Sequence, residues 1–432
     1  MINKIDGVQV KYIYSACIVT TTPDLSILHD PWFTEGIYDG SWFHFPKIQD
    51  PLQSIGNVDY IYISHVHPDH YDKNFLIQYF SRYGKKKILI ADHSPNHLKN
   101  KMIIDGFESE ILLGKLVVND TTVEILPHKT GSISDIDSAI IVKYESSINK
   151  RLHCVVNAND IIFDEQMISK LKSIAGEIDI LLCGYTGAGP YPQTYFDLTD
   201  QNLQAECERK KLSFFERYKN LIEKMNAKIN IPFAGKYVLG GRLIQLNQFR
   251  GVADPVEILD IDKNAIVLSD DGGTVCTDTL KTTDLRTALY PPEDIQNRLE
   301  ELKGFQMDYE RLINDDEKWQ LPIKRLLISA VKNANSRSEC LEDYFFFISL
   351  EKNEYAVINA NKNSKNLIYF TKDTESIPLP NCRIVIDIRY LFGLLTHIYH
   401  WNNAEVGSQY EARRTPNLLV RKAQSFLNYL TV

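Results

Sequence analysis

The chain has 432 residues, of which 44% are hydrophobic and 24% charged, and its formal net charge is −8. The length exceeds the usual limit of a single hydrophobic core and predicts two domains of ordinary globular composition. The negative charge argues against a broad surface for nucleic acid or an anionic membrane, but it is compatible with one small cationic pocket for a phosphorylated ligand.

The cysteines and the N-terminal residues predict the cellular compartment of the protein. The seven cysteines are scattered and include no Cys-x-x-Cys pair, which is typical of reduced thiols in a cytosolic protein. The first residues lack a charged segment followed by a long apolar run, and the chain has no apolar run of about 18 residues. We therefore expect a cytoplasmic protein with neither a cleaved signal nor a membrane span.

Short strands and helices alternate through the first half of the chain. A helix over 73–82 is predicted to begin after Asp72 and to end at Gly84. Further helices are predicted at 164–174 and 201–227. One hairpin is predicted over 8–20 and 25–29, and a second over 255–276. The remaining predicted strands are 60–64, 87–91, 122–126, 138–144, 152–157, 178–183 and 229–233. This alternation predicts a layered α/β core.

The pattern changes after about residue 285. The later predicted helices are 293–303, 306–318, 388–399 and 416–430, and the strands are 343–350, 354–359, 366–371 and 383–387. We therefore predict a first domain over 1–285 and a smaller α+β domain over 286–432.

The strongest chemical signal is the run Ser64-His65-Val66-His67-Pro68-Asp69-His70, which directly follows an apolar strand. Imidazole nitrogens and carboxylate oxygens are ligands of zinc, iron and manganese. At the end of a strand, this spacing lets His65 and His67 face one metal ion while Asp69 and His70 face a second. Because the chain has only 11 histidines, a chance cluster in a polar loop is the weaker interpretation.

Two further residues follow at places where metal ligands are expected. His128 lies in a loop between two predicted strands, and the alternative for it is an ordinary surface residue. Asp160 follows an apolar strand, where a carboxylate is well placed to bridge two cations. Its alternative is the N-cap of the next helix.

Together these motifs resemble the metallo-β-lactamase superfamily. The likeness rests on His65-x-His67-x-Asp69-His70, then His128-x-x-Gly-Ser, then Asp160-x-x-Phe163, and it extends to about residue 240. It implies an αββα sandwich with two divalent metal ions, Zn or Fe or alternatively Mn, at one sheet edge. By this resemblance His65, His67 and His128 hold the first ion, Asp69 and His70 hold the second, and Asp160 bridges them.

The chain departs from the superfamily at one position. A late histidine usually completes the second metal site, and none occurs near 180–190 or 229–240. The second ion is therefore weakly held, absent, or bound by another residue. The candidates are His397 and His400, followed by His93 and His97.

A narrower likeness is to the metallo-β-lactamase-like part of CMP-N-acetylneuraminate hydroxylase. The segments that carry it are Asp30-Pro31-Trp32, Trp42, 62–70, 184–192, Glu208-Arg209-Lys210-Lys211 and 231–235, with a fainter match near Trp401. Those hydroxylases also carry a Rieske domain, whose cluster needs two cysteines and two histidines. No such pattern occurs in this sequence, so a hydroxylase of this kind requires an external electron donor.

Three functions are compatible with these residues. The first is hydrolysis of a phosphoester, lactone or amide by a metal-activated water, with Asp69 or Asp160 accepting the proton. The second is oxygenation at a di-iron site. The third is a binding module with a degenerate site.

Candidate substrate contacts lie in two further segments. The Gly-rich turn offers backbone at Gly187 and Gly189 and rings at Tyr185 and Tyr191, while Arg413 and Arg414 offer paired guanidinium groups. For the Gly-rich turn, the alternative is a tight turn with a purely structural role. For Arg413 and Arg414, the alternative is a solvated segment. The Glu208–Lys211 run is interpreted as a solvated helix face rather than a phosphate contact.

The expected partner is a small molecule, phosphorylated or a sugar nucleotide, and neither nucleic acid nor a membrane is expected.

Overall fold

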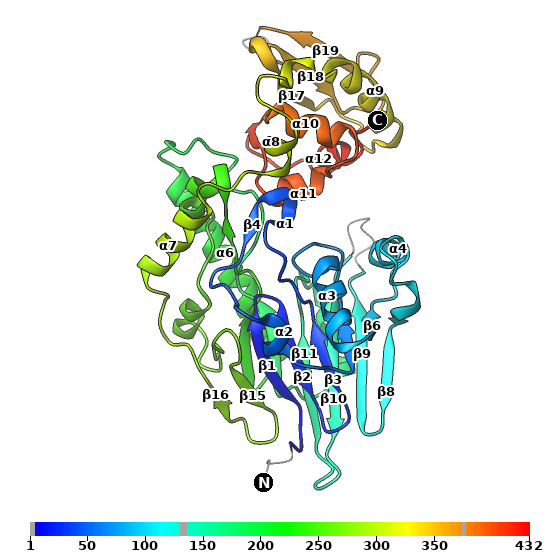
Figure 1. The fold of residues 1–432 in the computed structure, drawn as a ribbon, viewed down its shortest axis with the longest axis vertical. Coiled ribbons are helices and arrows are strands. Elements are labelled where there is room, and N and C mark those ends of the chain that lie inside the picture. Colours follow the sequence, from blue (N-terminus) through cyan, green and yellow to red (C-terminus); the bar gives the residue numbers. More distant parts are fainter. Residues whose placement is uncertain (1–4, 130–135, 374–376) are drawn as a thin grey trace.

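The computed structural model describes residues 5–129, 136–373 and 377–432 (Figure 1). Two sheets face each other in the first two thirds of the chain. One has the strand order β16 (Thr282–Thr283), β15 (Thr274–Cys276), β1 (Gln9–Tyr14), β2 (Cys17–Thr21), β3 (Ser26–His29), β5 (Tyr60–Tyr62), β6 (Lys87–Ile90) and β7 (Ile111–Leu113). The other has the order β13 (Ile229–Phe233), β12 (Ile180–Gly184), β11 (Leu152–Asn157), β10 (Ser138–Glu145), β9 (Thr121–Pro127) and β8 (Lys115–Val118).

Three apolar layers hold these sheets in place. Between the sheets, Val10 and Ile27 of the first pack with Ile140 and Ile180 of the second, each fully buried. Burial of one such side chain contributes about 1.5–3 kcal/mol. Helices cover the two outer faces: α2 (Pro51–Ile55), α3 (Lys73–Tyr83) and α4 (His97–Ile104) on the first sheet, and α5 (Glu165–Ala175) and α6 (Leu203–Met225) on the second. The predicted αββα sandwich is thereby confirmed.

A separate sheet forms the C-terminal part, with the strand order β19 (Ile368–Thr371), β18 (Tyr355–Asn359), β17 (Phe345–Ser349), β20 (Asn381–Val385) and β21 (Glu411–Thr415). The helices α8 (Asp308–Leu312), α9 (Ile323–Arg337), α10 (Ile388–Leu395) and α12 (Arg421–Leu427) pack against it. This part stands at one end of the sandwich, where α11 (Trp401–Val406) lies beside α1 (Ile37–Gly40) and β4 (Trp42–Phe43) (Figure 1). Its apolar core continues into Trp32 and Trp42 of the first part of the chain. The domain boundary expected between residues 285 and 286 stays a prediction.

The fold departs from the sequence predictions in several places. The hairpin expected over 255–276 is wrong: Asp254 caps a short 3₁₀ helix over Pro255–Asp260, and only Thr274–Cys276 is a strand, paired with β1. The helix α9 was not expected. Among the described residues, no helix is long and apolar enough to cross a membrane.

Candidate metal centre

The histidine run occupies the loop between β5 and α3, and two buried carboxylates fix its ends. Asp30 accepts a hydrogen bond from the backbone N–H of Ser64 at 2.7 Å, where β5 ends. Asp72 accepts from the N–H of Phe75 at 2.9 Å and so caps α3, as the sequence predicted. The loop is therefore anchored by Asp30 at the end of β5 and by Asp72 at the start of α3. Its side chains gather at one edge of the sandwich.

Imidazole nitrogens and carboxylate oxygens converge in this loop. Nε2 of His65 lies 2.8 Å from Nδ1 of His67. Nε2 of His70 lies 3.4 Å from Asp69 and 3.5 Å from Asp160, and ligand atoms of His65, His70 and Asp160 all lie within 4.8 Å of one another. Two donors bound to one zinc at about 2.0–2.1 Å stand roughly 3.3 Å apart, so these spacings fit a shared cation.

Each of the three imidazoles has a partner on its other ring nitrogen. Ligating histidines usually donate that second N–H to a carboxylate or carbonyl oxygen, which fixes the tautomer. The pattern fits coordination through Nε2 of His65 and His70 and through Nδ1 of His67. The outer contacts are His65 Nδ1 to Asp137 Oδ1 at 3.3 Å, His70 Nδ1 to Asp30 Oδ2 at 3.1 Å, and His67 Nε2 to Asn402 Oδ1 at 3.2 Å.

The charges of the group also fit a cation. Burial lowers the pKa values of His65 and His67, so both rings keep a lone pair for a ligand bond. Burial and the charge of Asp160 raise the pKa of Asp137 to about 7. Against the effect of burial, Asp69 and Asp160 raise the pKa of His70 well above its ordinary value. A divalent ion would neutralise this excess of buried carboxylate charge.

Tyr38 also belongs to the site, and no sequence motif predicts it. Its hydroxyl donates to Asp69 Oδ1 at 2.5 Å. Tyr38 and Asp39 both have left-handed backbone angles (φ 53° and 62°), which residues other than glycine rarely adopt. Nε2 of Gln409 donates to the carbonyl oxygens of both, at 3.0 and 3.1 Å, so the C-terminal part holds this strained pair in place.

The remaining candidate ligands lie around this group. His128 directly follows β9, and its backbone N–H donates to the carbonyl of Asp137 at 2.9 Å. It does not belong to the group that His65, His70 and Asp160 form, and residues 130–135 lie outside the described residues. His400 caps α11, and burial together with the charges of His397 and His67 lowers its pKa. His397 instead contacts Thr431 at 3.0 Å.

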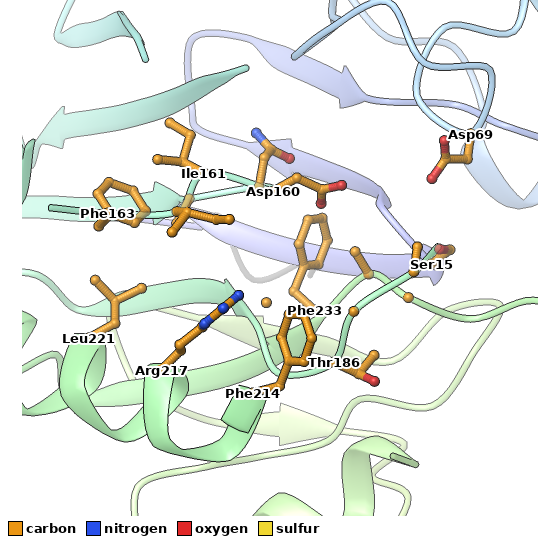
Figure 2. Close-up of a pocket in the computed structure, with 18 of the residues that line it drawn as sticks. Ser15, Asp69, Asp160, Ile161, Phe163, Thr186, Phe214, Arg217, Leu221 and Phe233 are labelled. Atoms are coloured by element: carbon orange, nitrogen blue, oxygen red, sulfur yellow. The ribbon is translucent and has the colours of Figure 1, made fainter. Parts of the chain in front are cut away.

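A cavity of about 270 Å³ adjoins the metal centre (Figure 2). Asp69 and Asp160 are among its lining residues. Phe163, Phe214, Leu221 and Phe233 form apolar walls, and Arg217 of α6 reaches towards it. The centre therefore adjoins a small, mainly apolar cavity.

The Gly-rich turn contributes to this cavity in a different way from the prediction. A Cβ on Gly187 would lie 1.9 Å from Cζ of Phe214, so Gly187 is needed for the close approach of that ring. Tyr185 is only 1% exposed, and its ring is packed in the core; it offers no stacking face, and that prediction is wrong. Gly189 has a left-handed backbone (φ 96°) and lies in the turn beyond the cavity lining.

The other predicted substrate contacts are engaged elsewhere. Tyr191 donates to Glu206 at 2.7 Å. Arg413 pairs with Asp197 at 3.1 Å, and Arg414 lies over the ring of Tyr195 at 4.2 Å. None of the three lines the cavity, and β21, which carries both arginines, was not expected from the sequence.

Sequence reasoning also missed Asp137, Asn402 and Arg217. Asp137 has no motif of its own, and Asn402 lies 335 positions from the histidine it contacts. Only the arrangement of the folded chain brings them together.

Solved structures of similar fold include a member of the metallo-β-lactamase superfamily from Thermotoga maritima, with TM-score 0.28, 16% identity, and 53% and 76% of the two chains covered. No family model matches the chain. Over 245 residues it is 29% identical to a protein of Mycolicibacterium smegmatis described as a Rieske 2Fe-2S iron-sulfur protein, a match that covers 54% of this chain and 44% of the relative. Over 317 residues it is 24% identical to the cytidine monophosphate-N-acetylneuraminic acid hydroxylase of Cricetulus griseus, covering 69% of this chain and 52% of that protein.

The chain thus spans about half the length of the curated relatives it matches. The likeness to CMP-N-acetylneuraminate hydroxylases is confirmed at this partial level. Similar solved structures include the diiron β-hydroxylase CmlA from Streptomyces venezuelae, with TM-score 0.42, 14% identity, and 63% and 54% of the two chains covered. They also include an isothiocyanate hydrolase from Delia radicum gut bacteria, with TM-score 0.41, 13% identity, and 62% and 98% covered.

Proposed function

We propose that this protein is a metal-dependent hydrolase of a small organic substrate, with a dinuclear His/Asp centre. The observation that carries the proposal is the two-sided hydrogen bonding of His65, His67 and His70. Each ring turns one nitrogen towards the other donors and the second towards an oxygen acceptor. His65 and His67 would hold the first ion, and Asp69, His70 and Asp160 the second. When bound, the ions would lower the pKa of water towards neutrality and so supply a nucleophile.

Asp160 is the better of the two predicted proton acceptors. Its side chain is 43% exposed and lines the cavity, whereas Asp69 is 15% exposed. Asp69 already accepts from Tyr38 through Oδ1 and faces His70 through Oδ2. Asp160 is therefore free to take a proton from water in the cavity, while Asp69 holds its position.

An oxygenase is the second candidate, and a specific observation favours it. The second metal position offers one imidazole, from His70, and two carboxylates, from Asp69 and Asp160, and oxygen-rich sets of this kind accept iron or manganese as well as zinc. The relatives named as cytidine monophosphate-N-acetylneuraminic acid hydroxylases also support an oxygenation reaction. This reaction would need electrons from a separate donor.

Metal analysis and two assays decide between these candidates. The full chain is purified anaerobically from cells supplied with both zinc and iron, and its metal content is measured. A hydrolase should cleave bis-(p-nitrophenyl) phosphate or a lactone without reductant. An oxygenase should hold iron and change its visible spectrum on reduction and exposure to oxygen. A protein that binds neither metal would contradict both and support a binding module.

A further inference from the structure

The cavity beside the metal centre has one cationic group among its described lining residues, Arg217. The other charged side chains of the lining, Asp69 and Asp160, belong to the metal centre. In Figure 2, Asp160 lies near the middle of the view and Asp69 lies on the side away from Arg217. The cavity lining thus combines two metal-binding carboxylates, several aromatic side chains and a single guanidinium.

The guanidinium of Arg217 contacts an aromatic ring but, among the described residues, no polar partner. No ion pair or side-chain hydrogen bond joins it to another residue within 5–129, 136–373 or 377–432. Its Cζ lies 4.9 Å from the centre of the Phe214 ring, which holds the planar group beside the cavity. By contrast, Arg209 on the same helix is paired with Glu206 at 2.6 Å. Arg217 thus keeps all of its donors for another partner.

The aromatic side chains that line the cavity favour a flat apolar ligand. Rings of Phe163, Phe214 and Phe233 line the space, and Gly187 allows the ring of Phe214 to close in on the turn. Ligand pockets for larger molecules usually measure about 300–1,000 Å³, so a cavity of about 270 Å³ fits a compact ligand. Aromatic walls of this kind pack well against another ring.

We propose that the cavity binds a small aromatic or similarly flat carboxylic acid, with its carboxylate on Arg217 and its other end towards Asp69 and Asp160. One guanidinium matches the single negative charge and the planar, two-oxygen shape of a carboxylate. A phosphate monoester would bring a second charge for which the described lining has no cation. The inference rests on the proposed function for the identity of the reacting end, but binding at Arg217 does not depend on the metal ions.

Calorimetric titration of the full chain tests this inference. The probes are phenylacetate, its neutral analogue phenylacetamide, and phenyl phosphate, each added to metal-loaded and to chelator-treated protein. We expect phenylacetate to bind more tightly than both other probes. Arg217→Gln should weaken phenylacetate binding by about fivefold or more, the upper range for an exposed ion pair, and should abolish the preference over the amide. Lys219→Gln, a charge change on the same helix outside the cavity lining, should alter neither.

Three results would overturn the inference: no binding of phenylacetate at millimolar concentration, equal binding of the acid and the amide, or tighter binding of phenyl phosphate. The outcomes are separable from those of the proposed function. Acid-selective binding in a protein without metal-dependent hydrolysis would contradict the hydrolase alone. Hydrolysis without acid selectivity would contradict the Arg217 site alone.

Discussion

Oδ1 of Asn402 lies 3.2 Å from Nε2 of His67, although 335 positions separate the two residues. An amide oxygen only accepts, so this contact requires the N–H of His67 on Nε2 and leaves the lone pair on Nδ1, which faces His65 at 2.8 Å. The first turn of α11 therefore selects the ligand-competent tautomer of His67. The C-terminal part is in this sense a component of the metal centre.

Asn402→Leu should weaken metal binding by about 10- to 100-fold, because outer partners of ligating histidines contribute that much to affinity. Competition with a chromophoric chelator measures it. Asn402→Asp keeps an acceptor at the same place and should bind metal nearly as well as the wild type. Asn403→Ala, on the same helix, serves as the control. Equal affinity in Asn402→Leu and wild type would show that the contact does not orient His67.

His65→Ala and Asp160→Ala test the assignment of the two metal positions. His65 is fully buried and faces His67, so its loss should remove the first ion and abolish metal-dependent turnover. Loss of Asp160 should lower the metal content and the rate, since this carboxylate both faces His70 and lines the cavity. Elemental analysis and turnover are measured together, with the exposed Glu165→Ala as a control. Undiminished turnover in either variant would remove that residue from the mechanism.

The sequence predicted the layers of the sandwich and the principal donors because both depend on local patterns. Apolar runs such as 60–64 predict buried strands, and the spacing of His65, His67 and His70 follows from one loop. The outer partners depend on tertiary packing instead. Asp137 and Asn402 meet the loop only after distant segments have folded, and no local pattern marks them.

Errors in the prediction have the same origin. The composition of the turn at Gly184–Gly189 predicts substrate contacts, with a tight structural turn as the alternative. The packing of Phe214 on Gly187 and the burial of Tyr185 are decided by α6 and the core, which the composition does not reveal. The hairpin expected over 255–276 does not form, because Asp254 caps a 3₁₀ helix over Pro255–Asp260 that has Pro255 at its first helical position.

Tyr38→Phe should destabilise the fold and weaken the second metal position. The hydroxyl donates to Asp69 at 2.5 Å, and a hydrogen bond to a charged group contributes about 1.5–3 kcal/mol. We expect a loss of that size in the free energy of unfolding, measured with urea on metal-free protein, and a lower metal content after dialysis. Tyr60→Phe provides a matched tyrosine change at the far end of β5. Wild-type stability and wild-type metal content in Tyr38→Phe would show that the contact has no such role.

Lys210 makes stability depend on pH. The run Glu208–Lys211 was expected on a solvated face, which is wrong for Lys210: it is 8% exposed, and its Nζ donates to the carbonyl of Arg250 at 2.8 Å. Burial, assisted by the charge of Arg250, lowers the pKa of Lys210 from 10.5 to about 7. Between these two values the unfolded chain holds a proton that the folded chain does not, so folding becomes more favourable as the pH rises.

From pH 7 towards pH 10, Lys210 should therefore raise the free energy of unfolding by up to about 1.4 kcal/mol per pH unit, and below about pH 7 its contribution should be flat because both states are protonated. Urea unfolding at several pH values in this window measures the slope. Lys210→Met should reduce the slope relative to wild type, whereas Lys219→Met, at a position on the same helix that is not buried, should preserve it. Parallel slopes in wild type and Lys210→Met would mean that Lys210 is protonated in the folded protein throughout this range, with its charge stabilised by the carbonyl of Arg250.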